Sequence, residues 1–431
     1  MKLSETYSCE DLQASVYLAP NQIRTCCKRF FFKGELKGDV VLLDVKDNVQ
    51  PTLKVILGAK QELVRQINAG IANPCTGCPW LRKDNWGPLE KLAIKHLSFE
   101  YHSVCNMRCT YCSDTYYGGM KPSYSVRELY DSMKNGRALE ECASVVWGGG
   151  EPTLAPDFAE LFHEVTASIA PVRHKIFSNA TRYLDFLSQA LAAGTVTLVT
   201  SVDAGSDEIF KKIRGLSARR AVLDNLQRYL SEGASGITIK YILTEDGNAA
   251  LSEVLEFVAA AKEFRLLSAD FQISGNFKDE RISADLFRGA ITLLDSLRAA
   301  GASSAHFDDH LSPRISGFAA QYPDIITHEF SEKIASPKYY PQVVIWGAGQ
   351  YAHRMLESCS FFKSVEVKYF IDEKIEKQGK FFHGKSVLSP LAIVDDELPI
   401  VIAVSSGFGD VLKSLHGLRV NLRRVVTKIL L

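Results

Sequence analysis

The stretch SVCNMRCTYC, residues 103–112, places Cys105, Cys109 and Cys112 within a few positions of one another. Three thiols do not fit the common structural uses of cysteine, because a structural zinc site takes four ligands and a disulfide takes two. Thiolates are soft ligands that favour zinc or iron–sulfur clusters. A protein shell that lacks one ligand leaves room for a reactant, as in catalytic zinc sites. The stretch therefore predicts a reactive metal centre.

The sequence around this stretch alternates strand and helix patterns. Strands are predicted at 94–104, 143–150, 172–181, 195–205, 236–244 and 268–275, and helices at 125–136, 155–170, 183–194, 219–232, 250–263 and 283–300. About six β–α units in a row predict an α/β fold with a parallel sheet and outer helices, open or closed as a partial (β/α)6 barrel. The cysteine trio follows the first strand directly, so it is expected at the carboxyl ends of the strands, where such folds carry their reactive groups.

The rest of the chain is expected to form two further parts joined to this core at residues 91–311. Residues 1–90 show short strand patterns on both sides of Pro20 and just before Val45. Residues 312–340 contain three prolines and are predicted to be a linker. Residues 341–431 are predicted to form a second, smaller α/β unit.

Composition limits the class of protein. With 50 Lys plus Arg and 50 Asp plus Glu among 431 residues, the net charge is zero. No nucleic-acid partner is expected from that balance, although a local basic patch stays compatible with it. The opening MKLSETYSCEDLQ has no apolar signal-peptide core, and no apolar run reaches the length of a membrane span. We therefore expect a cytoplasmic protein without a membrane partner, in which the ten cysteines serve metal or redox chemistry rather than disulfides.

The trio carries a family resemblance. The pattern C-x-x-x-C-x-aromatic-C, with Tyr111 as the aromatic residue, resembles the signature of the radical S-adenosylmethionine (SAM) superfamily. The resemblance implies a [4Fe–4S] cluster held by three cysteines, with SAM chelating the open iron through its amino and carboxylate groups. It further implies reductive cleavage of SAM to methionine and a 5′-deoxyadenosyl radical that abstracts a substrate hydrogen. A flavodoxin- or ferredoxin-type protein would then supply the electron.

The second predicted strand ends in VVWGGGEPTL, with Gly148, Gly149, Gly150 and Glu151. Glycines let a ligand approach the backbone closely, and a carboxylate beside them can receive an ammonium group. The stretch resembles the GGEP motif of the radical SAM superfamily, which implies contact with the SAM amino group. On its own, the same stretch is also typical of a simple turn.

Polar residues also end the third and fourth strands. Ser178 and Asn179 end the third, and Ser201 and Asp203 end the fourth. These residues resemble the family's polar strand ends, which contact the ribose and carboxylate of SAM. Arg214, somewhat later, could pair with that carboxylate in a bidentate manner. The alternative is that the polar residues simply cap helices.

Five further cysteines lie before the core. Cys9, Cys26 and the pair Cys75 and Cys78 resemble a SPASM or twitch module, which implies an auxiliary [4Fe–4S] cluster. Such modules usually follow the barrel, whereas this one precedes it. A structural zinc site would use the same four ligands. The spacing favours Cys26 over Cys27 as ligand, and we assign Cys27 as a spare thiol that could return a hydrogen atom to the substrate.

The C-terminal unit contains a G-x-G-x-x-A turn with Gly347, Gly349 and Ala352, and Asp372 lies at the distance of a ribose-binding acid. The unit is half the size of a usual dinucleotide-binding domain, so NAD is not favoured, and a plain tight turn is the alternative. The unit resembles small Rossmann-like modules fused to sugar-modifying enzymes. That resemblance implies a nucleotide-sugar or glycan substrate.

These observations give one leading hypothesis and two alternatives. We expect a radical SAM enzyme that epimerises or dehydrogenates a sugar or nucleotide-sugar. The alternative among enzymes is modification of a peptide. The alternative outside enzymes is a non-catalytic metal-binding scaffold.

Overall fold

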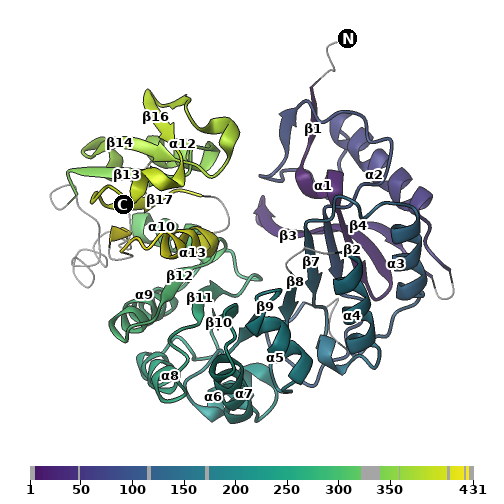
Figure 1. The fold of residues 1–431 in the computed structure, drawn as a ribbon, viewed down its shortest axis with the longest axis horizontal. Coiled ribbons are helices and arrows are strands. Elements are labelled where there is room, and N and C mark those ends of the chain that lie inside the picture. The colour runs from purple at the N-terminus through teal and green to yellow at the C-terminus, as the bar shows by residue number, and fades with distance from the viewer. Residues whose placement is uncertain are drawn as a thin grey trace.

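The computed structural model describes residues 5–46, 49–113, 118–169, 174–321, 340–358, 360–404, 408–421 and 424–426. A ten-stranded sheet with the order β12-β11-β10-β9-β8-β7-β6-β2-β3-β4 organises most of the chain. The strands from β6 to β12 curve in an arc, and the helices from α3 to α9 lie on its outer side (Figure 1). The predicted parallel sheet with outer helices is therefore confirmed.

Seven parallel strands form the core of this sheet, and the sequence had predicted six of them. The seventh, β12, follows the last predicted helix directly and is too short to give a clear alternation pattern. The strands are β6 (His96–Phe99), β7 (Ser144–Trp147), β8 (His174–Phe177), β9 (Val196–Ser201), β10 (Ile237–Leu243), β11 (Asp270–Gly275) and β12 (Ser304–Phe307).

The outer helices cover one face of the sheet with apolar side chains. In α9, which the sequence predicted at 283–300, Leu286, Leu293 and Leu297 form a buried apolar stripe. On the sheet, Trp147 stacks on Phe99 with ring centroids 4.4 Å apart. The helical segments are α3 (Val126–Asn135), η2 (Pro152–Leu154), α4 (Phe158–Ser168), α5 (Asp185–Ala192), α6 (Asp207–Arg214), α7 (Arg219–Ser231), α8 (Leu251–Glu263), α9 (Ala284–Ala299) and α10 (Leu311–Gln321). Helix α10 occupies the start of the predicted linker, and residues 322–339 lie outside the described part of the chain.

The N-terminal strands continue the core sheet, which differs from the expectation of a separate small module. Strand β2 pairs in parallel with β6, and β3 and β4 follow in antiparallel order. All five residues of β2 are buried, so this strand needs partners on both edges and cannot stand alone. The elements are β1 (Thr6–Ser8), α1 (Glu10–Ala14), β2 (Ser15–Ala19), β3 (Gln22–Phe32), β4 (Glu35–Asp44), α2 (Leu53–Asn68) and β5 (Arg82–Asp84), of which β1 and β5 pair with each other.

A separate five-stranded mixed sheet forms the C-terminal domain, with the order β15-β16-β14-β13-β17. Strand β15 is antiparallel to β16, and the other pairings are parallel. The elements are β13 (Gln342–Trp346), α12 (Gln350–Ser358), η4 (Ser360–Lys363), β14 (Glu366–Ile371), η5 (Ile375–Lys377), β15 (Phe381–Phe382), β16 (Lys385–Leu388), η6 (Pro390–Ile393), β17 (Ile400–Ile402) and α13 (Phe408–Gly417). In the described residues, no helix has the length and apolar character to cross a membrane.

Candidate active site

The loop that carries the cysteine trio is held by backbone hydrogen bonds at the carboxyl end of β6. The N–H groups of Arg108 and Thr110 donate to the carbonyls of Arg214 and Ile213, each at 2.9 Å. The N–H of Cys112 donates to the carbonyl of Cys109 at 3.0 Å, which closes a turn between these two cysteines. The loop is therefore fixed both to itself and to the end of α6.

The three thiols of this loop influence one another electrostatically. Burial raises the pKa of all three, to about 11 for Cys109, and the Cys105 thiolate further raises the pKa of Cys112. Cys105 is nevertheless exposed, and the other two are partly exposed. Three thiols in mutual range and open to solvent are the donor set that the predicted cluster requires. A metal centre binding there would displace the thiol protons.

The glycine stretch packs directly on the segment that leads into the trio. Gly149 has φ 90°, and a Cβ on Gly150 would lie 2.3 Å from the carbonyl oxygen of Val104. The N–H groups of Gly150 and Glu151 donate to the carbonyls of His102 and Val104 at 2.7 and 2.8 Å. Glycine is therefore required here because two protein loops approach each other closely. The sequence had predicted close approach of a ligand at the same glycines, and that contact stays a prediction.

Glu151 is buried, and its carboxylate accepts four hydrogen bonds from the protein. Oε1 accepts from the N–H and hydroxyl of Thr153 at 3.2 and 2.7 Å and from the Ser178 hydroxyl at 2.8 Å. Oε2 accepts from the N–H of Asn179 at 2.6 Å. Burial raises the pKa of Glu151, and these donors oppose that shift. Glu151 thus joins the ends of β7 and β8, and its contact with the SAM amino group stays a prediction.

The amide of Asn179 extends this network to the trio. Its Nδ2 donates to Oδ1 of Asn106 at 2.6 Å and approaches Sγ of Cys105 at 3.9 Å. Sequence reasoning had missed Asn106, which carries no signal beyond its place next to Cys105. The first cysteine is therefore linked to the glycine-rich stretch through side chains as well as backbone.

Asp203, Arg214 and Tyr111 form a buried group of their own. The guanidinium of Arg214 pairs with Oδ2 of Asp203 at 3.1 Å and contacts the Tyr111 hydroxyl, which donates to the same oxygen at 2.6 Å. Oδ1 of Asp203 accepts from the N–H of Ile242 at 2.8 Å. The carboxylate and guanidinium thus satisfy each other, whereas Ser201 stays partly exposed at the end of β9. Contacts of these residues with SAM stay predictions.

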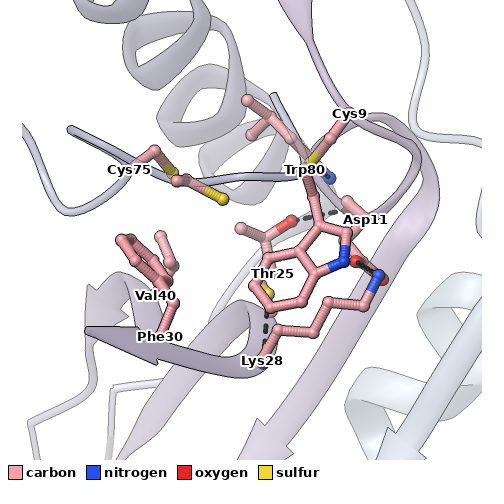
Figure 2. Close-up of a pocket in the computed structure, with 11 residues that line it drawn as sticks. Cys9, Asp11, Thr25, Lys28, Phe30, Val40, Cys75 and Trp80 are labelled. Carbon is pink, nitrogen blue, oxygen red and sulfur yellow. Dashed lines mark hydrogen bonds and ion pairs between the residues drawn. The ribbon is translucent and has the colours of Figure 1, made fainter. Parts of the chain in front are cut away.

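The four N-terminal cysteines line a single pocket. Cys9, Cys26, Cys75 and Cys78 line this pocket together with Leu12, Thr25, Lys28, Phe30, Val40, Trp80 and Asp11. Figure 2 shows Cys75 and Cys9 on opposite sides of the space, with the Trp80 ring across it. The sequence therefore predicted which cysteines come together, although it missed Lys28 and Trp80.

Each of these thiols is positioned by its local structure. Cys9 is the N-cap of α1 and accepts the N–H of Leu12 at 3.4 Å, and Cys26 lies on β3. Cys75 and Cys78 belong to one turn, in which the N–H of Cys78 donates to the carbonyl of Cys75 at 3.0 Å. Burial raises the pKa of all four thiols, to about 12 for Cys75. Four soft donors around one space with largely apolar walls fit a thiolate-bound metal centre. Among the described residues, no three Cys, His, Asp or Glu side chains are grouped around a single-ion position.

Cys27 faces away from this pocket, toward the inner side of the arc. It follows Cys26 on β3, whose pairing with β4 is irregular on both sides of Cys26, and it is not among the residues that line the pocket. The residue is exposed, but its thiol is surrounded by protein, hydrogen-bonds Tyr17 and lies in the field of Glu100, which directly follows β6. Surrounding protein and then Glu100 raise the pKa of Cys27 to about 12. A Cβ on Gly148 would lie 3.8 Å from both Glu100 and Phe177, so these residues continue the same inner face.

The C-terminal residues form the predicted turn but not an open ribose site. Gly347 has φ 115°, and a Cβ there would lie 2.4 Å from the carbonyl oxygen of Ala403. Asp372 is buried, accepts the N–H of Ala348 at 3.0 Å and pairs with Lys377 at 2.8 Å. Gly349 lies beside the same lysine. The Asp372 carboxylate therefore holds the turn, and nucleotide binding at Gly347, Gly349 and Asp372 stays a prediction.

Two cysteines, Cys142 and Cys359, lie outside both the trio and the N-terminal group. Cys142 is buried in the main core at the amino end of β7, as expected for a small apolar residue. Cys359 lies outside the described residues.

Comparison with known proteins identifies two segments of the chain. Residues 99–263 match the family model described as Radical SAM superfamily, and residues 339–426 match one described as C2185-like, N-terminal. The first segment contains the trio, the glycine-rich stretch and the Asp203–Arg214 pair. Residues 99–263 are thus a radical SAM core, and the family implies a [4Fe–4S] cluster and SAM.

Curated relatives match a similar portion of the chain. The GTP 3′,8-cyclase of Vibrio vulnificus is 26% identical over 156 residues, which cover 36% of this chain and 47% of that protein. The GTP 3′,8-cyclase of Pectobacterium atrosepticum is 28% identical over 167 residues, covering 38% and 51%. The chain therefore spans about half the length of the curated relatives it matches.

Solved structures show similarity at low identity. The crystal structure of Streptococcus suis SuiB has a TM-score of 0.39 and 14% identity, covering 64% of this chain and 58% of that chain. Native anSMEcpe with bound AdoMet has a TM-score of 0.37 and 21% identity, covering 47% and 59%.

The Asp203–Arg214 pair generates a stability prediction. Arg214→Met should lower the free energy of unfolding of metal-free, SAM-free protein by roughly 3–5 kcal/mol, because it leaves a buried carboxylate without its cation. Adding Asp203→Asn should recover part of that loss, since the uncompensated charge is then gone. Denaturant unfolding of the two single variants and the double variant measures both effects.

The matched control is Arg220→Met, which removes an exposed arginine paired with Asp224 at 3.2 Å. It should cost about 0.5 kcal/mol or less. If Arg214→Met unfolds like the wild-type protein and only its affinity for SAM is reduced, this arginine instead binds the SAM carboxylate.

Proposed function

We propose, from the premise that residues 99–263 are a radical SAM core, that the chain is an enzyme that abstracts a hydrogen atom from its substrate and returns one from Cys27. The observation that carries the proposal is the cysteine trio at the end of β6, which shares one continuous sheet with Cys27, an exposed residue on β3. The net reaction is then epimerisation at a C–H bond.

The chain's own residues prepare the cofactor position. Cys105, Cys109 and Cys112 would hold a [4Fe–4S] cluster at the carboxyl end of β6. When bound, the cluster and SAM supply reductive SAM cleavage and hydrogen abstraction, with electrons from a flavodoxin- or ferredoxin-type protein. Glu151 and Asn179 fix the backbone of the neighbouring strand ends against the trio loop. The loop thus needs little reorganisation when the cofactor binds.

The N-terminal pocket is proposed to hold an auxiliary cluster. Its four thiols line one pocket, and among the described residues no three metal-binding side chains are grouped around one ion position. That arrangement favours an iron–sulfur cluster, whose ligands stand farther apart than those of one zinc ion. A structural zinc remains the alternative and is distinguished by metal analysis.

Cys27 is suited to donate a hydrogen atom. A thiol pKa of about 12 keeps the S–H bond intact at neutral pH, and the residue is exposed. In the donating step the Cys27 S–H bond breaks and a C–H bond forms on the substrate carbon. The resulting sulfur radical takes one electron from the flavodoxin- or ferredoxin-type donor and one proton from solvent.

The structure favours a peptide over a nucleotide-sugar as substrate. The nucleotide-sugar hypothesis came from the resemblance of the C-terminal unit to modules of sugar-modifying enzymes, and its candidate ribose ligand, Asp372, is engaged by Ala348 and Lys377. On the inner face, Cys27, Phe177 and Lys175 are exposed, so a segment of a large substrate can reach the strand ends. We therefore propose a peptide segment as the first substrate class, with a sugar or nucleotide-sugar second.

Replacing any one cysteine of the trio by alanine should abolish conversion of SAM to 5′-deoxyadenosine. The reason is that two protein thiolates cannot hold the cluster with one iron open for SAM. Anaerobically reconstituted protein with dithionite and SAM, read by chromatography, measures this. Cys142→Ala is the matched control, since this thiol is buried on the amino side of β7. Full SAM turnover in a variant of the trio would rule out these cysteines as the cluster ligands. If the protein is a non-catalytic scaffold, the wild-type protein should not convert SAM either.

Cys27→Ser should leave 5′-deoxyadenosine formation intact and stop formation of the epimerised product. Serine has the size of cysteine but a much stronger bond to hydrogen, so the substrate radical is not quenched from that side. In D2O the wild-type product should carry one solvent deuterium, because the thiol exchanges with solvent. The hypothesis fails if Cys27→Ser yields the same deuterated product at the wild-type rate.

Asp372→Ala separates the two substrate classes. If the substrate is a peptide, this change should lower only the stability of the C-terminal domain and leave the Michaelis constant unaltered. Panels of peptides and nucleotide-sugars, assayed by mass shift under anaerobic conditions, identify the substrate first. A rise in the Michaelis constant of about tenfold for a nucleotide-sugar, without loss of folded protein, would reverse our order.

A further inference from the structure

The ammonium group of Lys60, on α2, is buried beside the four-cysteine pocket. Its side chain is fully buried, and Nζ donates to the carbonyls of Leu12 at 2.9 Å and Ser15 at 2.7 Å and to the Thr25 hydroxyl at 3.0 Å. Within the described residues, no carboxylate forms an ion pair with it. The carboxylate of Asp11 is engaged by Lys28 at 2.7 Å. Lys60 is therefore hydrogen-bonded but has no paired negative charge in the polypeptide.

Such a cation is costly to bury. Charges in protein interiors are normally paired, since neutral hydrogen-bond acceptors replace only part of the hydration that is lost. Burial lowers the pKa of Lys60 to about 7, and the Cys9 thiolate, the Asp11 carboxylate and the Cys26 thiolate oppose that shift. An anionic occupant of the pocket would supply the missing charge.

The pocket's donor set gives an occupant of the right sign. Four thiolates with one zinc ion, or with an oxidised [4Fe–4S] core, carry a formal charge of about −2. Lys60 contacts the two segments that carry Cys9 and Cys26. Leu12 lies in α1 and Ser15 ends it, and this helix begins directly after Cys9. Thr25 directly precedes Cys26 on β3. The ammonium group is fully buried, out of the solvent that would otherwise screen its field.

We infer that Lys60 is the internal counter-charge of the N-terminal metal centre, which it stabilises and whose reduced state it favours. The inference rests on the four-thiol site of the proposed function. The alternative is a purely structural role, in which Lys60 only caps the carbonyls at the end of α1. The two roles differ in one respect: a cap requires donors, whereas a counter-charge requires the positive charge.

The test uses the full chain with Cys105, Cys109 and Cys112 replaced by alanine, so that only the N-terminal centre contributes. Lys60→Met removes donors and charge, and Lys60→Gln retains N–H donors without the charge. Lys28→Met is the matched control, because Lys28 also lines the pocket but is 42% exposed and already paired with Asp11. Each variant is reconstituted and examined for metal content, thermal stability and midpoint potential by EPR-monitored titration.

Both Lys60 variants should shift the midpoint potential to more negative values, and by more than Lys28→Met, because the reduced centre loses its buried cation. If the centre binds zinc, chelator competition should show a loss of affinity on the order of tenfold in both Lys60 variants. The inference is overturned in favour of capping if Lys60→Gln is as stable as the parent protein and has the parent's midpoint potential. For a zinc centre, the corresponding outcome is zinc affinity equal to that of the parent. A parent protein that binds neither iron nor zinc would instead refute the four-thiol site itself.

Discussion

Compensation of buried charge determines which side chains in this protein are available to a cofactor. A charge removed from water needs a partner within a few ångströms, and the fold meets this need at two of three buried groups. Glu151 receives four hydrogen bonds, Asp203 and Arg214 pair with each other, and Lys60 has only neutral acceptors. The first two groups brace the strand ends that hold the trio. The third leaves a charge that the polypeptide does not neutralise, and it lies beside four thiols.

The continuous sheet brings the two cysteine groups into one structural unit. Because β2 pairs with β6, the N-terminal strands extend the same surface that ends at the trio. On β3, Cys26 lines the pocket, whereas the adjacent Cys27 does not and lies in the field of Glu100. One strand thus serves a metal site on one side and the substrate side on the other. This explains how a cysteine-rich segment can act on the core although it precedes the core in the chain.

Periodicity and spacing predicted the parts of the fold that repeat. The six strand–helix units and the apolar stripe on α9 follow from patterns that extend over many residues. Strand β12 is short and helix α10 contains a proline, and both were missed. Cysteine spacing predicted which four thiols share a pocket, because soft donors have few other uses in such a pattern. The partners of Glu151, Arg214 and Asp372 could not be predicted, since they depend on side chains distant in sequence. For Lys60 a signal existed: it lies on the same helix face as Ile56 and Leu63, both buried.

The central claim is that the trio leaves one iron of a cluster open and that SAM fills it. Electron–nuclear double resonance on the reduced, wild-type protein with SAM labelled at its amino nitrogen and carboxylate oxygen tests this most directly. The account predicts hyperfine coupling from both labelled atoms to the cluster, which requires direct coordination to iron. A reduced cluster whose spectrum shows no coupling to either label, with SAM present at saturating concentration, would contradict it.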